Sequence, residues 1–177
     1  MKLFITAALL FTSSLFAQTN TAHPSEADPL KTLSFLEGMW EGKTGSGSAG
    51  AQVTGTYTFQ RELRNHILAR HTNSIGACKG PAAFDCEHSD LLYVYQDAGG
   101  QSLKAIFFDN EGHVIHYDVS TPSPTTAVFL SDSSQPGPQF RLLYELKGQI
   151  MSGKFQMRMP GQEEWKSYLE WSGGKHM

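Results

Sequence analysis

Turn residues recur along this chain at a nearly constant spacing, and that spacing constrains the fold more than any other feature. From residue 99 onward the turn centres stand 11 to 14 residues apart. Most contain Gly, which adopts positive φ without strain, or Pro, whose φ suits tight turns. The segments between them are too short for typical helices. The predicted centres are Gly99, Glu111, Ser123, Gly137, Gly148, Gly161 and Gly173.

The segments between the turns are rich in Tyr, Phe, Val, Ile and Leu, which favour β-strands. Three further strands are expected upstream, over 39–44, 52–60 and 66–74, which makes about ten. In 52–60, Val53, Gly55, Tyr57 and Phe59 share one face. Short connections make sequence neighbours pair antiparallel, and a ten-strand meander tends to close because closure removes the sheet edges. We therefore predict an all-β, up-and-down antiparallel barrel, with an open sheet or a solid sandwich as the alternative.

One short helix is predicted ahead of the strands, over residues 28–38. Asp28 can cap it, Pro29 suits its first position and Gly38 can end it. Leucines at every third position give it one apolar stripe that should cover part of the core. The barrel domain is therefore expected to span residues 28–174.

The N-terminus resembles a secretory signal peptide over residues 1–17. Lys2 supplies the positive charge, residues 3–16 are mostly apolar, and Ala17 is a suitable small residue at the cleavage site. The apolar stretch is shorter than the roughly 20 residues that a membrane-spanning helix needs. Residues 18–27 are polar and are expected to form a flexible leader. We predict an exported protein, periplasmic or secreted, without a membrane span.

Two cysteines, Cys78 and Cys86, have seven residues between them, including Gly80 and Pro81. In an oxidising compartment this spacing favours a disulfide that closes a surface loop. The alternative is a zinc site with His88 as a third ligand, but no fourth ligand stands at a recognisable spacing. We predict the disulfide and no metal.

The charge balance excludes one class of partner. The chain of 177 residues has 14 Lys and Arg against 17 Asp and Glu, for a net charge of -3 at pH 7. That balance argues against a nucleic-acid-binding protein, which would carry a basic footprint. An aromatic content of 11% argues against disorder. The sequence does not specify an oligomeric state.

A short motif connects the helix to the first strand, and reads Leu36-Glu37-Gly38-Met39-Trp40-Glu41-Gly42. Gly38 permits a sharp helix-to-strand turn, and Trp40 can plug one end of a barrel. This Gly-x-Trp-x-Gly entry, with about ten strands and an export signal, resembles lipocalin-like (calycin) barrels, in particular nitrobindin-like and uncharacterised bacterial families. Residues 108–114 also resemble a mid-chain hairpin of those families.

The resemblance implies an apolar cavity for a small ligand rather than a defined reaction. Nitrobindins bind haem through a histidine near the end of the barrel. Here the last predicted strand, 163–171, has no histidine, and His176 lies in the terminal tail. Haem is therefore not expected, and no other cofactor is predicted.

Candidate ligand-binding residues are the aromatic residues of the strands and the few polar residues that could orient a ligand. Arg70 and Arg141 lie mid-strand and could bind a carboxylate, and His116 would be a polar handle if it faces inward. Exposure of His116 on the outer face is the alternative, and aromatic residues form the core of any barrel. The predicted set is Trp40, Tyr57, Arg70, Tyr93, Phe107, His116, Arg141 and Tyr144.

No motif for a specific reaction is present. The chain has no Gly-x-Ser-x-Gly, no phosphate-binding loop followed by Lys-Ser/Thr and no His-Glu-x-x-His. The carboxylates stand mainly in or beside turns, so they are expected to be solvated. No catalytic residue is predicted. The expected function is binding of a small apolar or amphipathic ligand. The alternatives are an enzyme that uses His66 or His116 as an acid or base, and a structural or interaction module with a filled core.

Overall fold

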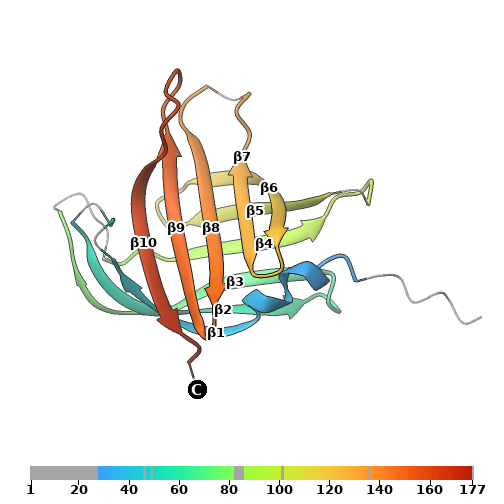
Figure 1. Cartoon of the computed structure of the whole chain (residues 1–177), viewed down its shortest axis with the longest axis horizontal. Helices are drawn as coiled ribbons and strands as arrows, with labels where there is room; N and C mark the ends of the chain where they lie inside the picture. Colours follow the sequence, from blue (N-terminus) through green and yellow to red (C-terminus); the bar gives the residue numbers. More distant parts are fainter. Residues whose placement is uncertain are drawn as a thin grey trace, which may run out of the picture.

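The computed structural model describes residues 28–176 except 46, 49, 82–85, 101 and 135. For residues 73 and 74 it describes the backbone but not the side chains. The expected signal peptide and leader lie outside these residues. Ten strands follow one short 3-10 helix, and they close into a single antiparallel barrel (Figure 1). Each strand pairs with its sequence neighbours, and β1 pairs with β10. The prediction of an all-β meander that closes is therefore confirmed.

The elements have the following bounds: η1 Lys31–Leu36, β1 Gly38–Thr44, β2 Gln52–Glu62, β3 Ile67–Lys79, β4 Asp90–Gln96, β5 Leu103–Asp109, β6 Val114–Ser123, β7 Thr126–Ser131, β8 Gln139–Lys147, β9 Ile150–Arg158 and β10 Lys166–Gly174.

The turn spacing predicted the connections well, with one error. Gly173 does not mark a turn, because it pairs with Met151 inside the β9–β10 ladder. A Cβ atom on Gly173 would lie 2.1 Å from the carbonyl oxygen of Glu41 on β1. This glycine is needed where two strands approach closely at the barrel seam, and the chain does not reverse there.

One end of the barrel is closed by η1 and Trp40. The helix is shorter than expected and adopts the tighter 3-10 geometry, with Leu33 and Leu36 fully buried. Gly38 then turns the chain into β1 at a φ of 120°, which favours glycine. Trp40 is 3% exposed, and its indole N–H donates to the carbonyl oxygen of Leu36 at 2.7 Å. This end is therefore packed solid, as the Gly-x-Trp motif suggested.

The opposite end carries every second connection. Because the strands alternate in direction, five connections lie at the end away from η1: 45–51, 80–89, 110–113, 132–138 and 159–165. Side chains of each strand alternate between interior and exterior. On β2, Val53, Gly55 and Tyr57 face a cavity and Phe59 is buried beyond them, as predicted.

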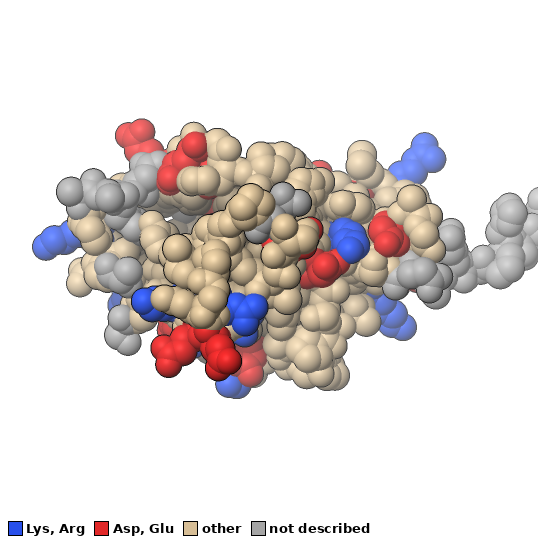
Figure 2. Space-filling model, turned by 90° about the horizontal axis from the view of Figure 1, so that it is seen from above, with Lys and Arg blue, Asp and Glu red and all other residues tan. Residues whose placement is uncertain are grey.

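The face of the molecule seen in Figure 2 is mostly uncharged. Lys and Arg side chains stand apart from one another on it, with Asp and Glu among them. Within the described part of the chain, no helix is long and apolar enough to cross a membrane.

Candidate ligand-binding site

A cavity of about 520 Å³ opens at the end of the barrel away from η1. Its walls are mainly apolar and come from both sides of the barrel. Ligand sites in proteins commonly have volumes of about 300–1,000 Å³ and apolar walls with a few placed polar groups. The main apolar wall residues are Phe107, Ile115, Leu142, Phe155, Met157 and Trp171.

A buried ion pair forms one wall of the cavity. Arg70 of β3 and Asp90 of β4 lie on the inward face of neighbouring strands, and their Nη1 and Oδ1 atoms are 2.5 Å apart. The two side chains are only 11% and 8% exposed. Burial alone would raise the pKa of Asp90, but the charge of Arg70 and hydrogen bonds from His88 and Thr72 lower it. Asp90 is therefore ionised and Arg70 is neutralised by it.

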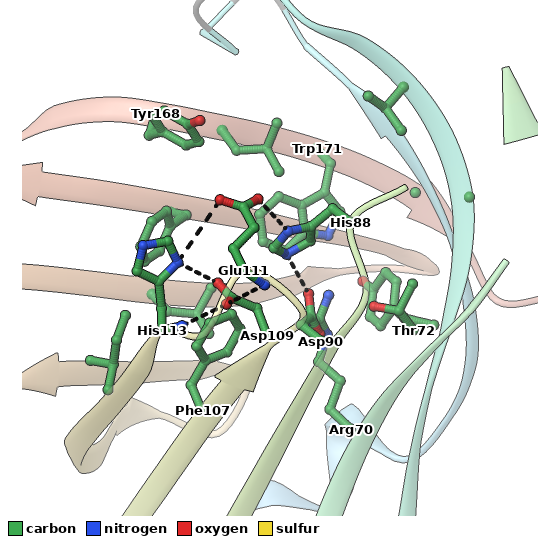
Figure 3. Close-up of a pocket in the computed structure, with 18 of the residues that line it drawn as sticks. Arg70, Thr72, His88, Asp90, Phe107, Asp109, Glu111, His113, Tyr168 and Trp171 are labelled. Atoms are coloured by element: carbon green, nitrogen blue, oxygen red, sulfur yellow. Dashed lines mark hydrogen bonds and ion pairs between the residues drawn. The ribbon is translucent and has the colours of Figure 1, made fainter. Parts of the chain in front are cut away.

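His88 links this ion pair to the mouth of the cavity (Figure 3). Its Nε2 atom lies 3.4 Å from Oδ2 of Asp90, and its Nδ1 atom lies 3.2 Å from Oε1 of Glu111. The interaction with Asp90 raises the pKa of His88, and Glu111 and Asp109 add to the rise against the effect of burial. Both ring nitrogens of His88 are directed at carboxylates, so this side chain links the β3–β4 loop to the β5–β6 loop.

A second histidine at the mouth is held by a buried carboxylate. Oδ1 of Asp109 accepts the backbone N–H groups of Glu111 and His113, and Oδ2 lies 2.8 Å from Nδ1 of His113. Burial opposes the ionised form of Asp109, but the backbone and side-chain hydrogen bonds from His113 lower its pKa. Asp109 is therefore ionised, and at the mouth of the cavity it lies with Glu111 and His88.

Trp171 projects into the cavity between two strand glycines. A Cβ atom on Gly153 would lie 2.2 Å from Cε2 and Cζ2 of the indole, and one on Gly42 would lie 3.4 Å from Cδ1. Gly153 is the cross-strand partner of Trp171. The absence of a side chain at Gly153 therefore makes the space that the indole occupies.

The predicted disulfide is confirmed, because Cys78 and Cys86 are bonded to each other. It ties the end of β3 to the segment that leads into His88 and Asp90. The cysteines are therefore not free to bind zinc with His88. No group of three or more His, Cys, Asp or Glu side chains in the described residues is arranged to hold a metal ion.

Three of the predicted ligand-binding residues line the cavity: Tyr57, Arg70 and Phe107. Two others lie in the packed interior and not in the cavity wall. Trp40 belongs to the closed end, and Tyr144 is fully buried with its ring 5.8 Å from that of Trp171.

The other three residues of the predicted set do not line the cavity, and His116 takes the exposed position given as its alternative. His116 is exposed because its neighbours Ile115 and Tyr117 take the inward positions of β6. Arg141 bonds to Gln156 on the next strand and lies 4.3 Å above the ring of Trp165. Tyr93 faces outward as well, and its ring packs edge-on against His71. None of these three lines the cavity.

Sequence reasoning missed the polar group at the mouth: His88, Asp90, Asp109, Glu111 and His113. Asp109 and Glu111 were expected to be solvated turn residues, whereas the Asp109 side chain is only 5% exposed. The sequence did contain a signal for Asp90. It stands two residues before Leu92, and residues two apart on a strand lie on the same face.

The fold and the cavity define a class: a closed ten-stranded antiparallel barrel with an interior site of ligand size. No protein-family model matches this chain, and a search of curated proteins finds no relative.

Proposed function

We propose that this protein is an exported binding protein that holds a small apolar or amphipathic ligand inside its barrel. The observation that carries the proposal is the cavity of about 520 Å³, which is open at one end and walled mainly by apolar side chains. That volume favours a binding protein over a structural module with a filled core. Each buried ligand CH₂ group would contribute about 0.8 kcal/mol before ordering costs.

We further propose that the barrel is of the calycin type, related to nitrobindin-like barrels. The ten-strand meander, the Gly-x-Trp entry and the plug formed by Trp40 support this relationship. Export is proposed on the strength of residues 1–17, and the Cys78–Cys86 disulfide is compatible with it.

Within the described chain, the haem-binding histidine that the nitrobindin resemblance implies near the end of the barrel is not matched by a histidine in the cavity wall from the last strand or the tail. Nδ1 of His176 lies 3.2 Å from Glu41, beside η1 and away from the cavity mouth. Both ring nitrogens of His88 face carboxylates. We therefore propose an organic ligand that binds without an iron ligand from the last strand.

Native mass spectrometry of the full chain, expressed with residues 1–17 and purified from the periplasm, tests the proposal. We expect a non-covalent adduct of a few hundred daltons that is lost on denaturation, and a mature chain that begins at Gln18. Bare protein, together with no thermal shift across a panel of lipids, would contradict ligand binding. An intact N-terminus would contradict export alone.

The second candidate function is an enzyme whose acid or base is a different histidine from the two that the sequence suggested. His66 is exposed in the turn between β2 and β3, and His116 is exposed on the outer face of β6. His113, in contrast, lines the cavity and has its Nδ1 atom held by the ionised Asp109. Such an arrangement can orient a histidine for proton transfer at Nε2. A substrate turned over by the native protein but not by His113→Gln would support this candidate, and unchanged turnover would exclude that role.

A further inference from the structure

The inner wall of the cavity carries polar atoms that no other protein group satisfies. Within the described residues, five buried side-chain polar atoms lack a hydrogen-bond partner: Tyr57 Oη, Arg70 Nε, Tyr117 Oη, Tyr144 Oη and Trp171 Nε1. Four of these side chains line the cavity, and the ring of Tyr144 packs against two of them. Buried polar groups without partners are rare in proteins, and each is costly unless something else satisfies it. Their gathering at one place points to a polar group of the ligand.

These atoms offer hydrogen bonds but little net charge. Burial raises the pKa of the Tyr57, Tyr117 and Tyr144 hydroxyls, although the Arg70 charge offsets part of each rise. The three hydroxyls therefore stay protonated and can donate. Nε of Arg70 and Nε1 of Trp171 can only donate. The Trp171 N–H lies close enough to the Tyr57 hydroxyl to lower its pKa, but not in hydrogen-bonding geometry.

The positive charge of Arg70 is already matched. Asp90 lies 2.5 Å from it and is itself buried, so the pair presents no net charge to the cavity. A carboxylate placed at the inner wall would lose its hydration without gaining an unpaired cation, which is unfavourable. The mouth adds to this bias, because the carboxylates of Asp109 and Glu111 lie there beside His88.

We propose that the ligand is a neutral molecule with a carbonyl-type acceptor, which accepts from Tyr117 and from Nε of Arg70, joined to an apolar body. This inference rests on the proposed binding function. The apolar body would lie against Phe107, Leu142 and Phe155, which face the same cavity. The site then discriminates by hydrogen bonding, because a buried donor left without an acceptor penalises a hydrocarbon.

Three ligands of the same size and shape test this: 2-undecanone, decanoate and 2-methylundecane. Each has twelve non-hydrogen atoms, and they differ only in carrying a ketone, a carboxylate or a branched alkane end. Their affinities for the full mature protein are measured at pH 7.5 by displacement of a fluorescent probe from the cavity. We expect 2-undecanone to bind about tenfold or more tightly than either of the others, which is the value of one to two buried hydrogen bonds.

Two variants assign the effect to the inner wall. Tyr117→Phe removes one donor and should lower the affinity for 2-undecanone about fivefold to tenfold, while the affinity for 2-methylundecane is unchanged or higher. Tyr93→Phe makes the same chemical change on the outside of the barrel and should alter neither affinity. A cooperative thermal transition for both variants verifies that they fold.

The outcomes separate the two proposals. If decanoate binds as tightly as 2-undecanone, the preference for a neutral acceptor is wrong but ligand binding stands. Equal loss of all three ligands in Tyr117→Phe would also overturn the hydrogen-bonding role. If none of the three binds to the native protein, both the inference and the binding function on which it rests are contradicted.

Discussion

The two ends of this barrel are built from the same ten strands, but their interiors differ: one is filled with apolar side chains and the other contains a cavity with polar groups in its wall. At the closed end, apolar side chains from η1 pack around Trp40, and the indole N–H of Trp40 donates a hydrogen bond to the carbonyl oxygen of Leu36. At the open end, charged side chains pair with each other, and the tyrosine hydroxyls of the inner wall have no hydrogen-bond partner among the described residues. Apolar packing therefore fills one end of the barrel, and the other end keeps an interior cavity.

The largest effect is expected from breaking the buried ion pair at the open end. Asp90→Leu leaves the Arg70 charge buried without its partner, so it should lower the free energy of unfolding by about 3–5 kcal/mol. Urea unfolding at pH 7 measures this. In the double variant Arg70→Met/Asp90→Leu no charge is stranded, and stability should return to within about 1–2 kcal/mol of the native value. A double variant as unstable as the single one would show that the pair itself, and not the unpaired charge, stabilises the barrel.

The same leucine truncation at each end tests the comparison directly. Leu33 of η1 is fully buried in packed surroundings, whereas Leu142 of β8 is 4% exposed and borders the cavity. We expect Leu33→Ala to cost about 3–5 kcal/mol and Leu142→Ala about 2 kcal/mol, because a side chain beside a void has fewer contacts to lose. Paired urea unfolding curves give both values. Equal costs would mean that the open end is as tightly packed as the closed end.

A third change moves the wall of the cavity. The methyl group of Gly153→Ala would lie 2.2 Å from Cε2 and Cζ2 of the Trp171 indole, so the ring must shift. Overpacking of this kind typically costs about 1–3 kcal/mol. We expect a change in tryptophan emission and weaker ligand binding.

Gly174→Ala is the matched control for Gly153→Ala. It lies on β10, and its added Cβ would meet nothing closer than 4.0 Å. It should leave emission and binding unchanged. Native-like binding by Gly153→Ala, despite altered emission, would show that Trp171 does not shape the ligand site.

The architecture could be predicted from the sequence because its signals are local. Turn residues, strand alternation and the Gly-x-Trp motif each act within a few positions, and the ten-strand barrel follows from short connections. Gly173 was misinterpreted because a glycine that permits close approach of β1 has the same local signature as one that permits a turn.

The site was less predictable because it depends on register between strands. Whether Arg70 meets Asp90 is decided by the β3–β4 pairing, and whether His116 or Tyr117 faces inward is decided by a shift of one residue. The clustering of Asp109 and Glu111 with His88 also required two loops to meet at one end of the barrel, and the contacting residues His88 and Glu111 are 23 positions apart in the sequence. No local pattern contains that information.

The smallest effect expected concerns the proton on His88. The pKa of His88 is raised in the folded protein, chiefly by Asp90, so protonated His88 stabilises the fold. That contribution is fully present below the ordinary pKa of 6.5 and is lost as the pH rises through the folded value. His88→Gln should therefore destabilise the barrel by about 0.2–1 kcal/mol at pH 6 and by less at pH 9. Urea unfolding of both proteins at the two pH values measures the difference.

His116→Gln removes a histidine that has no ion pair within the described chain, so it serves as the control for the loss of an imidazole. A His88→Gln penalty that grew with pH would mean that neutral His88 is the form that connects the two sides of the mouth, and the open end would then be held together by hydrogen bonds rather than by charge.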